Sequence, residues 1–333
     1  MRHRLLHIIL IQILGFIMLS ACHVHELPNE QAKDPTVVHV HLHLSPPEEM
    51  TLFEADERSR SDEESAAYTE RLIVEWKNLA TGRVIGRNVI TRPLEKKEKT
   101  FDLNEILSTE IYQLSVWRDI VPSGETNDYY YDTTDFSTIT LLGEHQGCLE
   151  NKDAYTTTAK IDLTSYRAQW ECDHYQTITL ERPLARFELV TTDVVKYMEK
   201  LEARSDKASD GIERLTIKIL YPSYFPDGFD LYENRPNHVS TGIGFHSSLV
   251  RLSENEASMG FDYLFVNGAQ SGIDVGLIIY NERGEEVNRT DCIHIPVKRN
   301  HSTIIKGDFL TLNYDSGIGI ETEFDGHINI IIP

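Results

Sequence analysis

Residues 36–44 read Thr-Val-Val-His-Val-His-Leu-His-Leu, and apolar and polar side chains alternate along them. Successive side chains of a β-strand point to opposite faces of the sheet. One face of this stretch therefore carries only apolar side chains, those of Val38, Val40, Leu42 and Leu44. The other face carries the imidazoles of His39, His41 and His43. This alternation predicts a half-buried strand whose histidines lie on a solvated outer face.

Neighbouring imidazoles on this strand could share a metal ion with a residue of the next strand. Three histidines in a row nevertheless diverge from a single tetrahedral centre. We therefore expect no metal site here, and no cofactor.

Similar short runs recur through the first half of the chain, with no helix between them that could connect parallel strands. They cover residues 71–77, 83–91, 99–103, 110–118, 137–142, 154–163 and 174–181. Residues 50–67 and 122–136 are polar and predict loops. This spacing is typical of a β-sandwich.

The second half continues the pattern after one short helix. Thr192 or Asp193 is expected to cap a helix over residues 194–204, which has a helical apolar stripe. Strands are expected at residues 184–190, 212–221, 239–245, 260–266, 274–280, 290–298, 303–312 and 327–332, with a loop over 222–237. The sequence predicts two tandem β-sandwich domains, residues 36–181 and 182–333.

The N-terminal segment has the pattern of an export signal. Arg2 and Arg4 precede an apolar run that is too short to span a membrane, so residues 1–21 are interpreted as a signal peptide. The run ends in Leu-Ser-Ala-Cys, which resembles the bacterial lipoprotein box and implies acylation of Cys22. An ordinary signal peptide with an incidental Cys22 is the alternative. Residues 22–35 are polar and predict a tether.

The charge of the chain excludes some partners. The sequence has 32 Lys and Arg against 53 Asp and Glu, a net charge of −21. Such an acidic protein repels nucleic acid, so no nucleic-acid partner is expected. If Cys22 is acylated, three cysteines remain, and export would permit one disulfide. Cys148 and Cys172 are the candidate pair, although both could equally stay free.

No catalytic motif is present. The sequence lacks an H-E-x-x-H zinc-binding motif, a G-x-S-x-G nucleophile elbow and a C-x-x-C pair. We therefore expect a protein that is not an enzyme. Aromatic residues in two predicted loops form a candidate ligand surface, because exposed rings can stack on sugars or on a partner. They are Tyr129, Tyr130, Tyr131, Tyr224, Phe225 and Tyr232, and core packing of some rings is the alternative.

Several stretches resemble fimbrillin-like lipoproteins of Bacteroidetes-type bacteria. Residues 181–188 (ERPLARFE) and 191–193 (TTD) resemble the strand that opens the C-terminal domain of these proteins. Residues 295–303, 307–311 and 324–329 resemble their late strands. Residues 22–26 and 143–147 point to an uncharacterised lipoprotein branch, a domain of unknown function. These motifs are structural rather than catalytic.

This resemblance implies two transthyretin-like, Greek-key sandwiches on a lipid-anchored protein of the outer membrane, exposed on the cell surface. Fimbrillins assemble when a neighbour's strand replaces their own first strand, which is β-augmentation. Residues 36–44 are expected to be a retained first strand. The chain is thus expected to be a fimbrial anchor or accessory subunit. The alternative is a stand-alone glycan- or host-ligand-binding lipoprotein that uses the aromatic loops.

Overall fold

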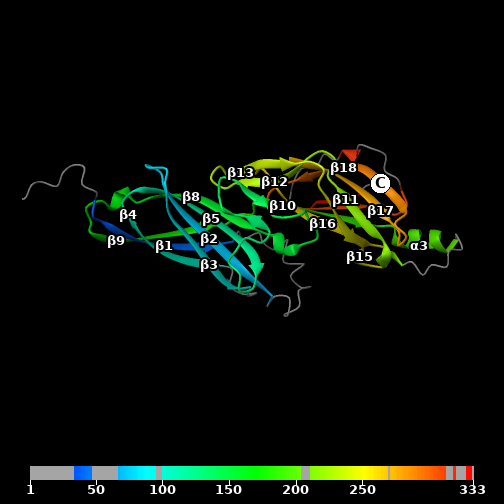
Figure 1. Cartoon of the computed structure of the whole chain (residues 1–333), viewed down its shortest axis with the longest axis horizontal. Coiled ribbons are helices and arrows are strands. Elements are labelled where there is room, and N and C mark those ends of the chain that lie inside the picture. The colour runs from blue at the N-terminus through cyan, green and yellow to red at the C-terminus, as the bar shows by residue number, and fades with distance from the viewer. Residues whose placement is uncertain are drawn as a thin grey trace, which may run out of the picture.

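The alternating stretch forms β1 (Val37–Ser45) and lies at the centre of a three-stranded sheet. Its neighbours are β4 (Phe101–Ser108) and β9 (Glu171–Thr179). The structure is a computed structural model that describes residues 34–46, 67–94, 100–203, 211–268, 271–312, 318–319 and 328–331. In it, two β-sandwiches follow one another along the long axis, with β1 at one end and β17 and β18 at the other (Figure 1).

A four-stranded sheet in the order β3-β2-β5-β8 faces the β1 sheet and completes the N-terminal sandwich. Its strands are β2 (Tyr68–Asn78), β3 (Val84–Pro93), β5 (Ile111–Pro122) and β8 (Tyr155–Asp162). The inward side chains of β1 pack in one core with Trp76, Tyr112 and Leu114. The period-2 pattern therefore predicts this core, because alternate residues of each strand face the opposite sheet.

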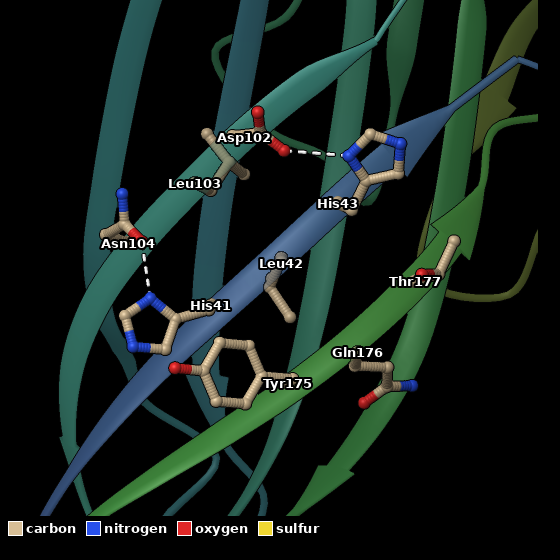
Figure 2. A pocket seen from close by; sticks show the side chains of 9 residues that line it. All are labelled: His41, Leu42, His43, Asp102, Leu103, Asn104, Tyr175, Gln176 and Thr177. Carbon is tan, nitrogen blue, oxygen red and sulfur yellow. Dashed lines mark hydrogen bonds and ion pairs between the residues drawn. The ribbon is translucent and has the colours of Figure 1, made fainter.

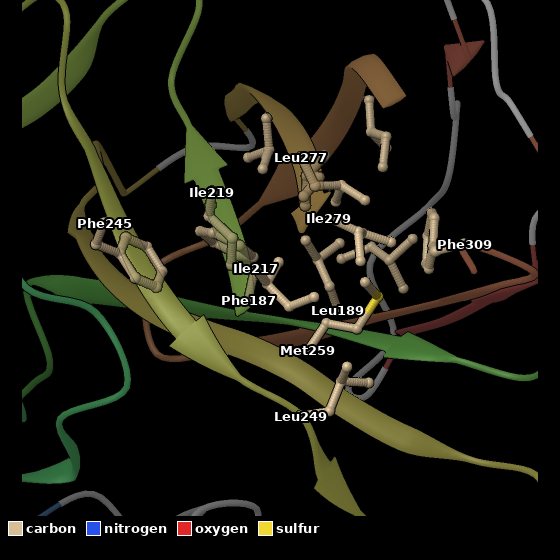
Figure 3. Close-up of a cluster of buried hydrophobic side chains, with 14 of the residues drawn as sticks. Phe187, Leu189, Ile217, Ile219, Phe245, Leu249, Met259, Leu277, Ile279 and Phe309 are labelled. Carbon is tan, nitrogen blue, oxygen red and sulfur yellow. The ribbon is translucent and has the colours of Figure 1, made fainter. Parts of the chain in front are cut away.

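Two five-stranded sheets form the C-terminal sandwich. The first has the order β15-β16-β10-β19-β21, with β10 (Leu184–Thr191), β15 (Val250–Arg251), β16 (Ala257–Phe265), β19 (Ser302–Gly307) and β21 (Ile328–Ile331). The second has the order β14-β11-β17-β18-β20, with β11 (Thr216–Leu220), β14 (Gly244–Ser248), β17 (Ser271–Tyr280), β18 (Glu286–Val297) and β20 (Ile318–Gly319). Phe187, Leu189, Ile217 and Met259 meet in the core between them (Figure 3).

The helix predicted at the start of this sandwich is α3 (Val194–Ala203). A residue that is distant in sequence caps its first turn, because the backbone N–H of Val195 donates to Asn255 Oδ1 at 3.0 Å. Three short 3₁₀ helices complete the helical content of the described residues, namely η3 (Glu150–Lys152), η4 (Thr164–Tyr166) and η5 (Ile212–Arg214). The mainly β prediction with one short helix is confirmed.

The first strands of the two sandwiches have the same surroundings. β1 pairs antiparallel with β4 and parallel with β9. β10 likewise pairs antiparallel with β16 and parallel with β19. Each half therefore places its first strand between an antiparallel and a parallel neighbour.

A small sheet at the junction, in the order β13-β12-β7-β6, was not predicted. It joins β6 (Tyr131–Asp132) and β7 (Ile139–Leu141) of the first half to β12 (Phe225–Asp230) and β13 (Arg235–Ser240) of the second. The prediction of loops over residues 122–136 and 222–237 is therefore wrong in part. Phe136 and Phe229 lie in a third apolar core at this junction, so contacts between distant segments override the polar local composition.

Candidate functional site

β1 fills a slot between two strands along almost its whole length. Its antiparallel register with β4 runs from Val37 opposite Ser108 to Leu44 opposite Phe101. Its parallel register with β9 runs from Val37 opposite Glu171 to Ser45 opposite Thr179. Main-chain pairing on both edges makes β1 the element that joins β4 to β9.

The inward face of β1 is buried. Four of its side chains are at most 2% exposed, those of Val38, Val40, Leu42 and Leu44. Complete burial of a side chain of this size contributes about 1.5–3 kcal/mol. The apolar face therefore supplies most of the free energy that holds the strand in its slot.

The outward face of β1 carries the three histidines, as predicted, and each lies at hydrogen-bond distance from a neighbouring strand. His39 Nε2 lies 2.9 Å from Glu171 Oε1 on β9. His43 Nδ1 lies 2.7 Å from Asp102 Oδ1 on β4 (Figure 2). These contacts connect β1 to both neighbours on the side away from the core.

His41 lies between the two neighbours and contacts both. Its Nδ1 is 2.6 Å from Asn104 Oδ1 on β4, and its Nε2 is 3.0 Å from Asp173 Oδ1 on β9. These hydrogen bonds, with Asp173 the larger contribution, raise the pKa of the His41 imidazole above its ordinary value. The imidazolium is the form they favour, because it donates from both nitrogens.

The ring of Tyr175 stacks on His41 with 4.6 Å between ring centroids and 15° between ring planes. The two rings lie beside an open depression of about 380 Å³ across the three strands (Figure 2). Its lining residues are His41, Leu42, His43, Asp102, Leu103, Asn104, Tyr175, Gln176 and Thr177. Among the described residues no group of three His, Cys, Asp or Glu side chains is placed to hold a metal ion.

The predicted aromatic ligand surface is not assembled. Tyr131 and Phe225 are fully buried, so the prediction is wrong for these two rings. Tyr131 packs edge-on against Trp117, 5.1 Å between centroids, in the junction core. Tyr129 and Tyr224 are each 48% exposed, whereas Tyr130 and Tyr232 are half-buried. The Tyr232 hydroxyl donates to Glu75 Oε1.

The predicted disulfide is absent, because Cys148 and Cys172 both carry free thiols. The backbone N–H of Cys148 donates to the carbonyl of Phe261 on β16, in the C-terminal sandwich. Cys172 lies on β9, opposite Val38 of β1, in the N-terminal sandwich. Proximity in sequence misled this prediction, because the chain folds the two cysteines into different sandwiches.

A buried polar cluster at the junction was missed. Asp262 on β16 is 1% exposed and accepts hydrogen bonds from the Tyr221 hydroxyl, at 2.5 Å, and from the backbone N–H of Tyr263, at 2.9 Å. His145 Nε2 lies 2.6 Å from the same carboxylate, and Lys152 Nζ lies 3.7 Å from it. The sequence feature that could have predicted this cluster is Asp262, a carboxylate inside the apolar run GFDYLFV.

A second buried pair lies in the N-terminal sandwich. Arg71 and Asp119 form a two-point ion pair, with Nε–Oδ1 at 2.8 Å and Nη2–Oδ2 at 2.5 Å. Arg71 Nη1 also donates to Asp128 Oδ1 at 2.8 Å. Asp128 also accepts from the backbone N–H of Thr133, so it ties residues 122–136 to β2.

Cys22 and the expected signal peptide lie outside the described residues, as do residues 324–329 of the family resemblance apart from two of them. Within the described part of the chain, no helix has the length and apolarity needed to cross a membrane.

Comparison with known proteins identifies a family whose function is not assigned. Residues 30–333 match the family described as "Family of unknown function (DUF6562)". No curated protein matches the chain. The uncharacterised family was expected from the sequence, and its description names no ligand or reaction.

Several solved structures are similar to this chain at low sequence identity. The fimbrial anchor protein Mfa2 from Porphyromonas gingivalis is 11% identical, with 77% of this chain and 82% of that chain covered and a TM-score of 0.43. A candidate adhesin from Bacteroides ovatus is 10% identical, with 94% and 98% covered and a TM-score of 0.41. A candidate polysaccharide-binding protein from Bacteroides thetaiotaomicron is 9% identical, with 76% and 79% covered and a TM-score of 0.42. Function must therefore be argued from the residues of this chain.

Proposed function

This chain belongs to the DUF6562 family, a family of unknown function, and we propose that it is a non-enzymatic cell-surface protein of fimbrial or adhesin type. In this proposal it acts as an anchor or accessory subunit and associates with other subunits through β-strand pairing. The exchangeable strand is β1. The proposal starts from the resemblance of residues 181–193 and 295–311 to fimbrillin-like lipoproteins, and it depends on the placement of β1.

One observation carries the proposal. β1 is the first strand of the described chain, yet it lies between two strands rather than at an edge of its sheet. Its withdrawal would expose two unpaired backbone edges and the apolar floor on which four side chains pack. Such a slot accepts an extended segment of another chain, because main-chain hydrogen bonds supply affinity and alternate side chains set the register.

We also propose that Cys22 is acylated and holds the protein at the outer membrane. The support is the order of elements in the sequence, from basic residues through an apolar run to Leu-Ser-Ala-Cys. A single acyl chain binds membranes weakly, whereas several chains on one cysteine would give a lasting anchor. Replacement of Cys22 by Ser should move the protein from the membrane fraction to the soluble fraction.

The first experiment locates the protein in cells. Surface filaments are sheared off and probed, beside the membrane fraction, with an antibody to residues 34–333. Recovery in SDS-resistant high-mass material is expected, with retention in the membrane fraction for an anchor. A chain without residues 36–44 should lose this assembly or assemble differently. Monomer alone, in the membrane fraction alone, would contradict a fimbrial role.

A second experiment tests strand exchange on the purified protein. A protease site placed within residues 47–66 allows the chain to be cut after folding, so that β1 stays in its slot without a covalent link. A fluorescent peptide of residues 36–46 should then replace β1 slowly, with a rise in anisotropy. The uncut protein is the control and should not bind the peptide. Equal binding to cut and uncut protein would show that the peptide binds elsewhere.

The alternative function is ligand binding by exposed aromatic loops, and it keeps Tyr129 and Tyr224 as its exposed rings. Their replacement by Ala should abolish retention on a glycan or host-ligand array while the fold is unchanged. Retention that survives both replacements would end this alternative.

A further inference from the structure

The sheet that holds β1 contains no lysine and no arginine. Its three strands read VVHVHLHLS, FDLNEILS and ECDHYQTIT. Their anionic side chains are Asp102, Glu105, Glu171 and Asp173. Their only basic side chains are four imidazoles, those of His39, His41, His43 and His174. The charge of this sheet therefore depends on histidine protonation, which changes in the range from about pH 5 to pH 8.

The three histidines on β1 lie at the contacts between β1 and its two neighbouring strands. Each is within 3.0 Å of an oxygen on a neighbouring strand, and the carboxylates are distributed over both neighbours. On β9 these are Glu171 and Asp173, and on β4 it is Asp102. A protonated imidazole adds a charge-assisted hydrogen bond from β1 to its neighbour, which is stronger than the neutral one.

His41 depends on protonation most directly, because both of its ring nitrogens face oxygens. The imidazolium donates to Asp173 and to Asn104 at the same time, whereas a neutral ring has one donor. A neutral ring must lose one of the two bonds or turn the Asn104 amide. The remaining group against this ring is the Tyr175 phenol, which stacks on it.

We infer that the histidine face of β1 is a proton-dependent latch, which holds β1 in its slot more firmly at mildly acidic than at alkaline pH. Because this latch would regulate the exchange of β1, it rests on the proposed function. The inward face of β1 is apolar and does not titrate, so deprotonation weakens the hold on the strand without expelling it. Proton loss leaves β4 and β9 with carboxylates alone, and nothing on β1 then compensates them.

The direction of the pH effect follows from the pKa of His41. Hydrogen bonds that the His41 ring donates to Asp173 and to Asn104 raise that pKa above its ordinary value. A raised histidine pKa gives stabilisation that is complete below the unfolded value and is lost as pH rises through the folded value. The latch therefore holds β1 most firmly at mildly acidic pH and weakens as pH rises through the folded pKa of His41.

Peptide exchange on the cut protein tests the latch. Release of β1, measured by anisotropy with the peptide of residues 36–46, should be about 5- to 10-fold faster near pH 8 than near pH 5.5. The variant H39N/H41N/H43N, with the same changes in the peptide, should lose this ratio. His294→Asn is the matched control, because His294 forms a similar exposed pair with Asp274 at 2.8 Å in the other sandwich. It should keep the ratio.

Hydrogen exchange of the intact protein gives a second readout that needs no strand release. Protection of β1 amides, corrected for intrinsic exchange and referenced to β10, should fall several-fold between the two pH values. Unchanged protection, or a pH effect that survives in H39N/H41N/H43N, would overturn the latch. If the cut protein never exchanges its strand but β1 protection still depends on these histidines, the latch stands and the proposed exchange fails.

Discussion

His145 and Asp262 come from opposite halves of the chain, and their side chains meet with 2.6 Å between Nε2 and Oδ2. The imidazole lies among the rings of Tyr221, Phe225 and Phe245, at centroid distances of 4.5–5.9 Å. Residues 143–152 therefore belong to the first half by sequence and also contact the second half. This segment couples the two sandwiches.

The first prediction concerns the charge of Asp262. Asp262→Asn keeps the shape but removes the counter-ion of Lys152, which is 4% exposed. Removal of one partner from a buried ionic cluster costs about 3–5 kcal/mol. The free energy of unfolding from urea titration should fall by this amount. Asp274→Asn, in an exposed pair with His294, is the control and should cost about 1 kcal/mol or less. Equal losses would mean that burial at the junction is unimportant.

The second prediction is the acid dependence of the same residue. Burial opposes ionisation of Asp262, but the Lys152 ammonium and the hydrogen bonds with His145 and Tyr221 outweigh it, so the pKa of Asp262 lies below its ordinary value. A lowered carboxylate pKa gives stabilisation that is present above the unfolded value and is lost as pH falls through the folded value.

The difference in unfolding free energy between the native protein and Asp262→Asn should therefore be constant above about pH 5 and shrink below about pH 4. Urea titrations at several pH values measure it. A difference that grows on acidification would show that the native carboxyl is protonated instead.

The features predicted correctly from the sequence are those that depend on short-range patterns of side chains. Alternation in residues 36–44 placed Val40 inside and His41 outside, because a strand has a side-chain period of two. The histidine partners could not be predicted, because the register between β1, β4 and β9 joins residues more than 50 positions apart. Asp173 came within reach of His41 only through that register.

The junction was missed for a related reason. Residues 122–136 are polar on average, yet Tyr131 and Phe136 are fully buried against residues of both halves. Propensity describes a segment alone, whereas here a distant partner such as Phe229 decides burial. The domain limits of 36–181 and 182–333 stay a prediction, and β7 of the first half pairs with β12 of the second across the proposed boundary.

The third prediction concerns the buried pair of Arg71 and Asp119. Arg71→Met leaves Asp119 buried without its charge partner and should cost about 3–5 kcal/mol of unfolding free energy. The double variant Arg71→Met with Asp119→Leu removes both charges, so it should be more stable than either single variant. A double-mutant cycle from urea unfolding measures this. Additive losses would contradict an interaction between the two side chains.

The fourth prediction is a thiol count. A soluble form of residues 23–333 retains three of the four cysteines, and Cys148 and Cys172 are free. A thiol reagent applied in denaturant without reductant should report three thiols, and two for Cys172→Ser. A count of one in the unchanged protein would mean that a disulfide forms after all.

The last prediction separates the two faces of β1. Leu42 is 2% exposed and Val37 is 38% exposed, although both lie on the same nine-residue strand. Leu→Ala in a packed core costs about 2–5 kcal/mol, because contacts are lost and a cavity remains. A peptide of residues 36–46 with Leu42→Ala should therefore bind the emptied slot at least about 30-fold more weakly. Val37→Ala should change its affinity by less than about 3-fold, since little apolar surface is removed from contact. If both replacements weaken binding equally, the peptide does not enter the slot with the β1 register.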